Sequence, residues 1–255
     1  MQEVKEANLD ASSRIYELED LREVDKHGLI RRKGADVQCP IDGKKGAAYV
    51  HSISDPDAVG TAEIMLSYAW GYTIGDIVDT LKEYCKKISK DPKDVYVWIC
   101  CFCVNQHRVI ELKKEGKDIP FEDFRKVFND RVTRIGHIVT MMAPWDAPVY
   151  LTRIWCVFEI YTANKTGSKV TIAMPSSERT RFIDGLRIED GQSQIDTLFS
   201  TLGQTDVKKA EASVESDRTS ILRIIEDGVG YDGFNNTVSG LLKDWAVSMI
   251  IAEVE

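Results

Sequence analysis

The sequence lacks the segments that direct a chain into or across a membrane. Met1 is followed by Gln-Glu-Val-Lys-Glu, without the apolar stretch of a signal peptide. The most apolar run, Val95 to Val104, has about ten residues, whereas a membrane-spanning helix needs about twenty. We therefore expect a cytoplasmic protein without a membrane span.

The sequence also lacks the glycine-rich loops that hold phosphate in many nucleotide enzymes. It has no Walker loop and no Gly-x-Gly-x-x-Gly motif. The phosphate-binding loops that are typical of kinases and dehydrogenases are therefore missing, which argues against both functions. Of its six cysteines, Cys100, Cys101 and Cys103 lie in an apolar run that predicts a strand. We expect buried free thiols in a reducing compartment and no metal site, with Cys39 as the one exposed thiol.

A basic surface is missing as well. The 255 residues carry a formal net charge of -8, and lysine and arginine are scattered among the acidic residues. Such a balance argues against a nucleic-acid or anionic-membrane binder, although it leaves room for a local phosphate site. The 43% hydrophobic content is that of a globular chain with a substantial core.

Strand-like and helix-like segments alternate in the middle of the chain. Strands are predicted at 62–68, 95–101, 137–143 and 169–174, and helices at 74–88, 121–135 and 151–162. This alternation is typical of an α/β fold, and we predict a parallel flavodoxin-like sheet with helices on both faces over residues 62–175. In such sheets the ligand lies outside the carboxyl ends of the strands.

The flanking segments differ in character from the middle. Residues 1–61 predict a weak amphipathic helix within the first 25 residues and an irregular arm with one short strand at 47–50. Residues 176–255 predict a C-terminal helical extension packed on the same domain, with helices at 177–186, 195–202, 216–227 and 234–254. Ser216 is a candidate cap for the third of these, and Asn235 or Asn236 for the last.

Polar and aromatic residues gather where the predicted strands end. The candidate ligand-binding residues are Ser67, Tyr68, Trp70, Gly71, Asn105, Gln106, Trp145 and Arg153, with Glu159 as the candidate catalytic carboxylate. The first strand runs into Ser67-Tyr68-Ala69-Trp70-Gly71, and the second into Asn105-Gln106-His107.

The order of these segments along the chain resembles that of motifs in known domain families. A strand ending in Ser67-Tyr68, a buried second strand and a later Trp155-Cys156-x-x-Glu159 helix are similar to the Toll/interleukin-1 receptor (TIR) domain. LSYAWG and CVNQ also resemble the fungal heterokaryon-incompatibility (HET) domain. CPIDGKKGAAYV, WICCFCVNQHRV and APWDAPVYLTRIWCVFEI resemble a family common in algae and other protists, over nearly the whole chain.

The resemblance implies a signalling or defence (innate immunity) module. Many TIR domains self-associate, and others cleave NAD at the nicotinamide–ribose bond with the glutamate that corresponds to Glu159. A TIR-like NAD glycohydrolase would need no cofactor, since NAD is its substrate. Trp70 or Tyr68 would stack on a ring of the nucleotide, and Ser67, Asn105 and Gln106 would bind ribose or phosphate.

Less specific interpretations stand beside this one. In one alternative, Glu159 faces solvent and forms an ion pair with Arg153 or Lys165. In another, the side chains of Asn105 and Gln106 form hydrogen bonds that close a loop. The segments after the first two strands depart from the usual TIR pattern. The whole chain also fits a non-enzymatic module that associates with itself or with protein partners, or a structural subunit of a larger assembly.

Overall fold

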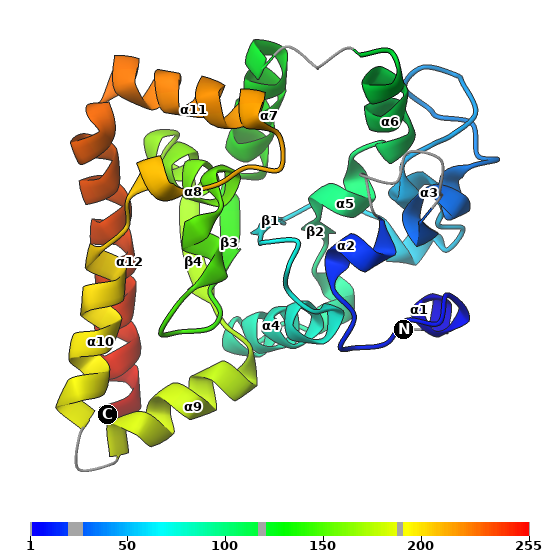
Figure 1. The fold of residues 1–255 in the computed structure, drawn as a ribbon. Coiled ribbons are helices and arrows are strands. Elements are labelled where there is room, and N and C mark those ends of the chain that lie inside the picture. The colour runs from blue at the N-terminus through cyan, green and yellow to red at the C-terminus, as the bar shows by residue number, and fades with distance from the viewer. Residues whose placement is uncertain (1, 20–27, 117–120, 188–190, 255) are drawn as a thin grey trace. The chain divides into compact units, whose positions relative to one another are not determined.

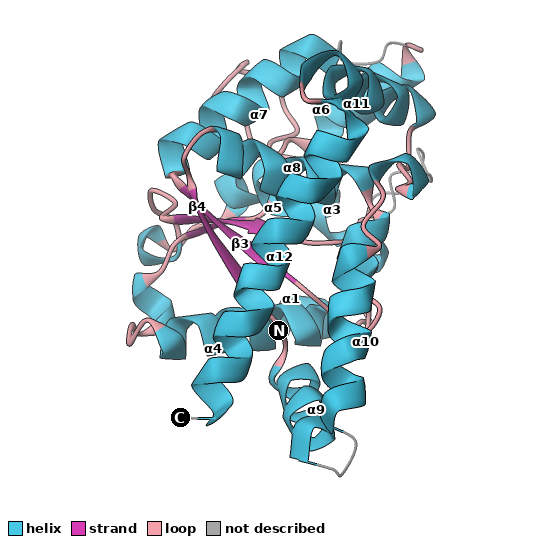
Figure 2. Cartoon of the chain, turned by 90° about the vertical axis from the view of Figure 1, so that its left-hand side faces the viewer, coloured by secondary structure: helices cyan, strands magenta, loops and turns pink. Residues whose placement is uncertain are grey.

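The computed structural model describes residues 2–19, 28–116, 121–187 and 191–254. Within these ranges lie four strands and twelve α-helices, together with short 3-10 helices (Figures 1 and 2). The strands are β1 (Ile64–Ser67), β2 (Val97–Trp98), β3 (His137–Met141) and β4 (Lys169–Ala173). The α-helices are α1 (Gln2–Glu6), α2 (Ile15–Leu18), α3 (Leu29–Gly34), α4 (Ile74–Lys87), α5 (Cys100–Cys103), α6 (Gln106–Lys114), α7 (Phe121–Ile135), α8 (Ile154–Lys165), α9 (Ser176–Arg187), α10 (Gly191–Gly203), α11 (Glu215–Gly228) and α12 (Gly230–Val254).

The four strands form one sheet in the order β2-β1-β3-β4. The pairs β1–β2 and β3–β4 are parallel. The two central strands are mostly apolar: every residue of β1 is buried, as is every residue of β3 after His137. Such runs are typical of strands covered on both faces, because neither face meets water. The predicted α/β fold with a parallel sheet is confirmed.

The chain divides into two compact units, which are described separately. The first contains residues 1–66 and 70–135. Its helix α4 begins at the N-cap Thr73, whose hydroxyl accepts a hydrogen bond from the amide of Asp76 at 3.0 Å. In the same unit α7 packs on β2, where the guanidinium of Arg131 lies 4.6 Å from the ring centre of Trp98.

The second unit contains residues 67–69 and 136–255, and α8 lies at its centre. One side of α8 packs on β3 and β4, and α11 and α12 pack on it as well. Because it is covered from several sides, α8 is apolar around most of its circumference, with eight buried residues among twelve. Helices α10 and α12 lie side by side (Figure 1). The buried residues of α12 include Phe234, Val238, Leu242 and Ala246, which recur at four-residue intervals.

The second predicted strand, 95–101, is wrong in its second half. Only Val97 and Trp98 are extended, and Cys100–Cys103 form helix α5, closed by a 3.0 Å bond from the amide of Val104 to the carbonyl of Cys100. β2 is an edge strand whose two residues are partly exposed, so the continuous apolar run does not mark a strand covered on both faces.

The arm also differs from its prediction. The expected strand at 47–50 is replaced by a 3-10 helix, η1 (Tyr49–Ser52), and α3 lies in the segment predicted as irregular. The amide of Ala47 donates to the carbonyl of Gly34 at 2.9 Å. A side chain at Gly34 would meet the Ala47 carbonyl at 2.1 Å, so this close approach requires glycine. Cys39, predicted exposed, is buried.

The terminal helices start and stop differently from the predictions. In place of the single amphipathic helix predicted within the first 25 residues, the described part of this segment holds two short helices, α1 and α2, and residues 20–25 lie outside the described residues. The N-cap of α11 is Val214 and not Ser216. Asn235 and Asn236 lie inside α12, and Asn235 instead accepts a 3.0 Å bond from the amide of Val207.

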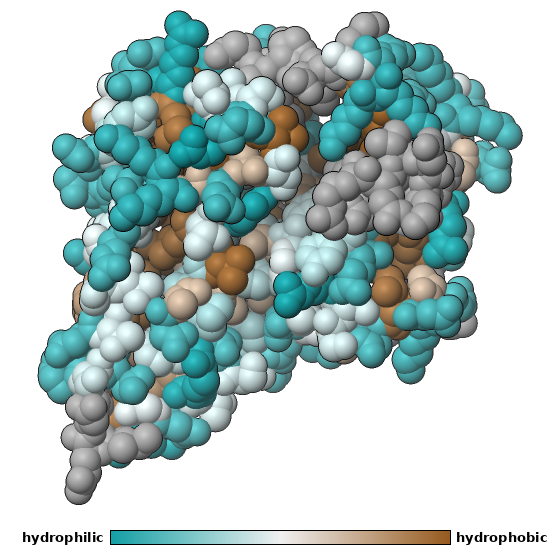
Figure 3. Space-filling view, viewed as in Figure 1, coloured by the Kyte–Doolittle hydropathy of each residue, from teal (hydrophilic) through white to brown (hydrophobic). Residues whose placement is uncertain are grey.

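Hydrophilic residues cover most of the face seen in Figure 3, where apolar residues appear in small areas. In the described part of the chain, no helix has both the length and the apolar character that crossing a bilayer requires.

Candidate functional site

Glu159 is a carboxyl group set into an apolar helix. It lies in the middle of α8 between Phe158 and Ile160, which are both buried, and its own side chain is partly buried. Burial raises the pKa of this carboxyl to about 7, and the hydrogen bond with Ser67 opposes that rise. At neutral pH Glu159 is therefore divided between its neutral and its ionised form.

Ser67 is the contact that holds the Glu159 carboxyl. It is the last residue of β1 and is fully buried, and its hydroxyl lies in hydrogen-bonding contact with Oε2 of Glu159. The same hydroxyl lies 2.7 Å from the phenol oxygen of Tyr150. The strand end therefore orients the carboxyl through a hydroxyl that has a second buried partner.

Tyr150 is the member of this cluster that the sequence did not indicate. It lies on the 3-10 helix η4 (Val149–Thr152), and its side chain is fully buried. Its hydroxyl donates to the backbone carbonyl of Cys156, one turn before Glu159 on α8. Burial raises the pKa of this phenol well above 10, so Tyr150 stays neutral at physiological pH.

The predicted ion pairs of Glu159 do not form among the described residues. Arg153 instead donates to the hydroxyl of Ser213 at 2.8 Å and forms a backbone bridge with Glu211. The ammonium group of Lys165 lies 5.7 Å from the ring centre of Tyr161. Glu159 is thus a carboxyl whose described partner is a neutral hydroxyl.

Tyr68 and Trp145 are buried at other places in the second unit. Tyr68 is 4% exposed, and its carbonyl accepts from the thiol of Cys156 at 3.5 Å. Trp145 is 3% exposed and packs edge-on against Phe182 at 5.1 Å, with Arg181 over its ring. Their rings support the fold, and neither presents a free face for a ligand to stack on.

A polar hollow lies beside Trp145, at the start of α9. Ser177, Arg181 and Gln194 are among its lining residues. Arg181 is bound there by Asp146 at 2.8 Å and by Glu178 at 2.8 Å, so its charge is already neutralised. Among the described residues that line the hollow, none is therefore a free cation that would attract an anionic ligand.

Trp70 and Gly71 belong to the first unit. The indole N–H of Trp70 points to the sulfur of Cys100 at 3.5 Å, and its side chain is partly exposed. Gly71 has no atom within 4 Å of the position that a Cβ would occupy, so open space adjoins it. Among the predicted aromatic residues, Trp70 is the one that keeps an exposed portion.

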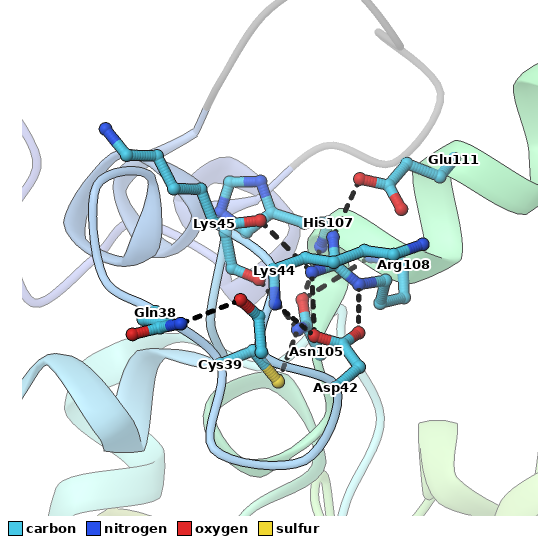
Figure 4. A network of polar contacts seen from close by, with 11 residues as sticks. Gln38, Cys39, Asp42, Lys44, Lys45, Asn105, His107, Arg108 and Glu111 are labelled. Atoms are coloured by element: carbon cyan, nitrogen blue, oxygen red, sulfur yellow. Dashed lines mark hydrogen bonds and ion pairs between the residues drawn. The ribbon is translucent and has the colours of Figure 1, made fainter.

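Asn105 closes a loop of the arm onto α6 (Figure 4). Its side-chain oxygen accepts from the amides of His107 and Arg108 as the N-cap of α6, and its side-chain nitrogen donates to the carbonyl of Gly46 at 2.9 Å. Arg108 then binds the carboxylate of Asp42 through Nε at 2.6 Å and through Nη2 at 3.2 Å. All hydrogen-bonding groups of the Asn105 side chain are thus used by the protein itself.

His107 and Gln106 complete the same structural role. The Nε2 atom of His107 lies 3.0 Å from the carbonyl of Arg31 on α3. Gln106 is buried and donates to the carbonyl of Val104 at 3.2 Å. Of the two interpretations of this segment, the geometry favours loop closure.

The cysteines are free thiols in the described structure. Cys100 and Cys103 stand at Cys-x-x-Cys spacing on α5, but the described residues contain no group of three metal-ligating side chains. Burial raises the pKa of the Cys103 thiol, which disfavours the thiolate that binds metal.

Among the sequence-predicted residues, the structure therefore brings Ser67 and Glu159 into contact and places Tyr68, Trp145 and Arg153 in other contacts of the second unit. A buried Tyr two residues after a Pro carries no recognisable pattern, and Tyr150 was missed for that reason. Comparisons of the chain with protein-family models, with curated proteins and with solved structures find no match.

Proposed function

We propose that this chain is a TIR/HET-like signalling or defence module that binds NAD or a related nucleotide and cleaves NAD at the nicotinamide–ribose bond. The observation that carries the proposal is the carboxyl of Glu159, partly buried without a cationic partner among the described residues and held by Ser67 at the carboxyl end of β1. Ligands of parallel sheets bind beside such strand ends.

One carboxylate suffices for this reaction. A glycosidase needs a second carboxyl group because its alkoxide leaving group has to be protonated. Nicotinamide leaves a cationic pyridinium as a neutral molecule, and therefore no general acid is required. An ionised Glu159 stabilises the positive charge that develops on the ribose ring. Ser67 orients this carboxylate.

The test is the release of nicotinamide from NAD by the purified protein. We expect turnover in the wild type, loss of at least 100-fold in Glu159→Gln, and wild-type turnover in Glu215→Gln, which changes an exposed glutamate of the second unit. Absence of turnover at high protein concentration, or equal turnover in Glu159→Gln, contradicts the proposal.

A second candidate function is non-enzymatic self-association, favoured by one observation on α12. Val247 and Ile251, one helical turn apart, are 44% and 51% exposed. Apolar side chains on one face of a helix favour a protein partner. The double variant Val247→Lys/Ile251→Lys would lower the mass measured by light scattering if the chain associates through this face, and an unchanged mass at all concentrations would exclude it.

A further inference from the structure

The cysteines of the chain differ in their exposure to solvent. Two of them, Cys100 and Cys103, are partly exposed. The other four are buried, and they are Cys39, Cys85, Cys101 and Cys156. The two thiols that solvent reaches are also the two that stand at Cys-x-x-Cys spacing. In a reducing compartment, paired cysteines of this kind form transient, redox-sensing disulfides.

Helix α5 places these two thiols on one face of a single turn. The amide of Cys103 donates to the carbonyl of Ile99 at 2.9 Å, and the amide of Val104 donates to that of Cys100 at 3.0 Å. Residues three apart in a helix have Cα atoms about 5 Å apart and side chains on the same face. A disulfide accepts Cα separations of about 4.4 to 6.8 Å, so the backbone brings the pair within bonding range.

Closing the bond requires a small movement of the turn. Side chains three apart on a helix have Cβ atoms about 5 to 6 Å apart, whereas those of a disulfide are about 3.5 to 4.5 Å apart. Because α5 consists of the four residues Cys100–Cys103, few backbone hydrogen bonds resist this movement. The turn can therefore close and reopen without disturbing a long helix.

The two thiols have different surroundings. The indole N–H of Trp70 donates to the sulfur of Cys100 at 3.5 Å, and such a donor stabilises a thiolate more than a thiol. Burial raises the pKa of the Cys103 thiol, and the backbone of Ile99 and the guanidinium of Arg131 oppose that rise. Cys100 is therefore the better nucleophile, and Cys103 stays protonated until it meets an activated sulfur.

We infer that Cys100 and Cys103 form a redox modification site that a peroxide closes to a disulfide and a small thiol reopens. The thiolate of Cys100 attacks one peroxide oxygen, the O–O bond breaks, and the leaving hydroxide takes up the proton that Cys100 lost, which gives water and a sulfenic acid. The sulfur of Cys103 then attacks the sulfur of Cys100, the S–O bond breaks, and the hydroxyl leaves with the Cys103 proton as a second water. The sulfurs lose two electrons, which the peroxide gains.

The aromatic ring between the two cysteines links this site to the arm. Phe102 lies on α5, and its ring centre is 4.9 Å from that of Tyr49 on η1, which packs on α5. We expect disulfide formation to shift Phe102 and to raise hydrogen exchange in η1 and at the amide of Val104. All these residues belong to the first unit and none binds a nucleotide in the proposed function, so the inference is independent of NAD cleavage.

The experiment is mass spectrometry of the full chain after treatment with hydrogen peroxide. Remaining thiols are alkylated under denaturing conditions, and the tryptic peptide of residues 94–108 is sequenced by fragmentation. In the wild type we expect this peptide to have lost two hydrogen atoms, with Cys101 alkylated and a bond between Cys100 and Cys103. Dithiothreitol restores alkylation of all three cysteines. After peroxide treatment, alkylation of all three, a disulfide that includes Cys101, or a bond between two chains overturns the inference.

Two variants test the separate roles of the thiols. Cys103→Ser should stop at the sulfenic acid of Cys100, which a cyclic 1,3-diketone traps, and Cys100→Ser should give neither the trapped adduct nor the disulfide. Cys85→Ala, which changes a buried cysteine of α4, should form the disulfide as the wild type does. A trapped adduct on Cys103 in Cys100→Ser would overturn the assignment of Cys100 as the attacking thiol. The bond itself is located in the wild type, so this result does not depend on the folding of any variant.

Discussion

The carboxyl of Glu159 on α8 is hydrogen-bonded to the hydroxyl of Ser67, which lies 92 positions earlier at the end of β1. A strand end and a helix face thus meet at one polar contact inside an otherwise apolar environment. The apolar environment disfavours the ionised carboxyl, and the hydrogen bond with Ser67 offsets part of this effect.

The stability of the protein should decrease as the pH rises through the range in which Glu159 ionises. The folded-state pKa of about 7 lies above the ordinary value of 4.5, so the native state binds more protons than the unfolded state between these values. This contribution to the free energy of unfolding is fully present below pH 4.5 and is lost as the pH rises through about 7, and it amounts to at most about 3 kcal/mol.

Glu159→Gln, which stays neutral, should therefore be more stable than the wild type above pH 7 and lose this part of the pH dependence. Urea unfolding of both proteins at pH 5 and pH 8 measures the difference. A gap between the two proteins that is the same at both pH values would show that the pKa of Glu159 is not raised in the folded state.

Asn105 should contribute to stability and not to ligand binding. Asn105→Ala removes the N-cap of α6 and the bond to the Gly46 carbonyl, and we expect a loss of about 1 to 2 kcal/mol in urea unfolding. Asn164→Ala, an exposed asparagine at the end of α8, serves as the control. If Asn105→Ala keeps wild-type stability but loses nucleotide binding, Asn105 binds the ligand and this prediction is wrong.

The Asp42–Arg108 contact should hold the arm loop at neutral pH and release it in acid. Arg108 holds the pKa of the Asp42 carboxyl well below its usual range. The contribution is therefore present above pH 3.8 and is lost as the pH falls toward the folded-state pKa.

Asp42→Asn imitates the acid state, and we expect faster hydrogen exchange in the loop around residues 39–46 at pH 7. The matched control is Asp36→Asn, because the Asp36 side chain is 94% exposed. Equal exchange in the wild type and Asp42→Asn would mean that the loop is held by its backbone bonds and by Asn105 without the ion pair.

The sheet was predictable because each central strand is a short, mostly apolar run that can be recognised in the local sequence. Ile64–Leu66 is apolar throughout and Ile138–Met141 is apolar except for Thr140, while the apolar residues of the segments between them recur with helical period. The run at Val95–Val104 carries the same signal but ends in a helix. Periodicity over so few residues does not distinguish an edge strand from a buried helical turn.

The candidate site was predictable only in part. Ser67 and Glu159 stood out because one ends a strand and the other is a carboxylate in an apolar helix. Tyr150 did not stand out, since its role depends on a hydrogen bond from its hydroxyl on η4 to the backbone carbonyl of Cys156 on α8. The sequence could not show whether Asn105 binds a ligand or closes a loop, because its partner in the loop, the carbonyl of Gly46, lies 59 residues away in the chain.

The most direct test of the central claim is the rate of nicotinamide release from NAD as a function of pH, in the wild type and in Glu159→Gln. We predict a rate that rises with pH through a midpoint near 7 in the wild type, as Glu159 ionises, and no measurable rate in Glu159→Gln. A rate in Glu159→Gln equal to that of the wild type, or no release by either protein at any pH, would contradict the assignment of Glu159 as the reactive carboxylate.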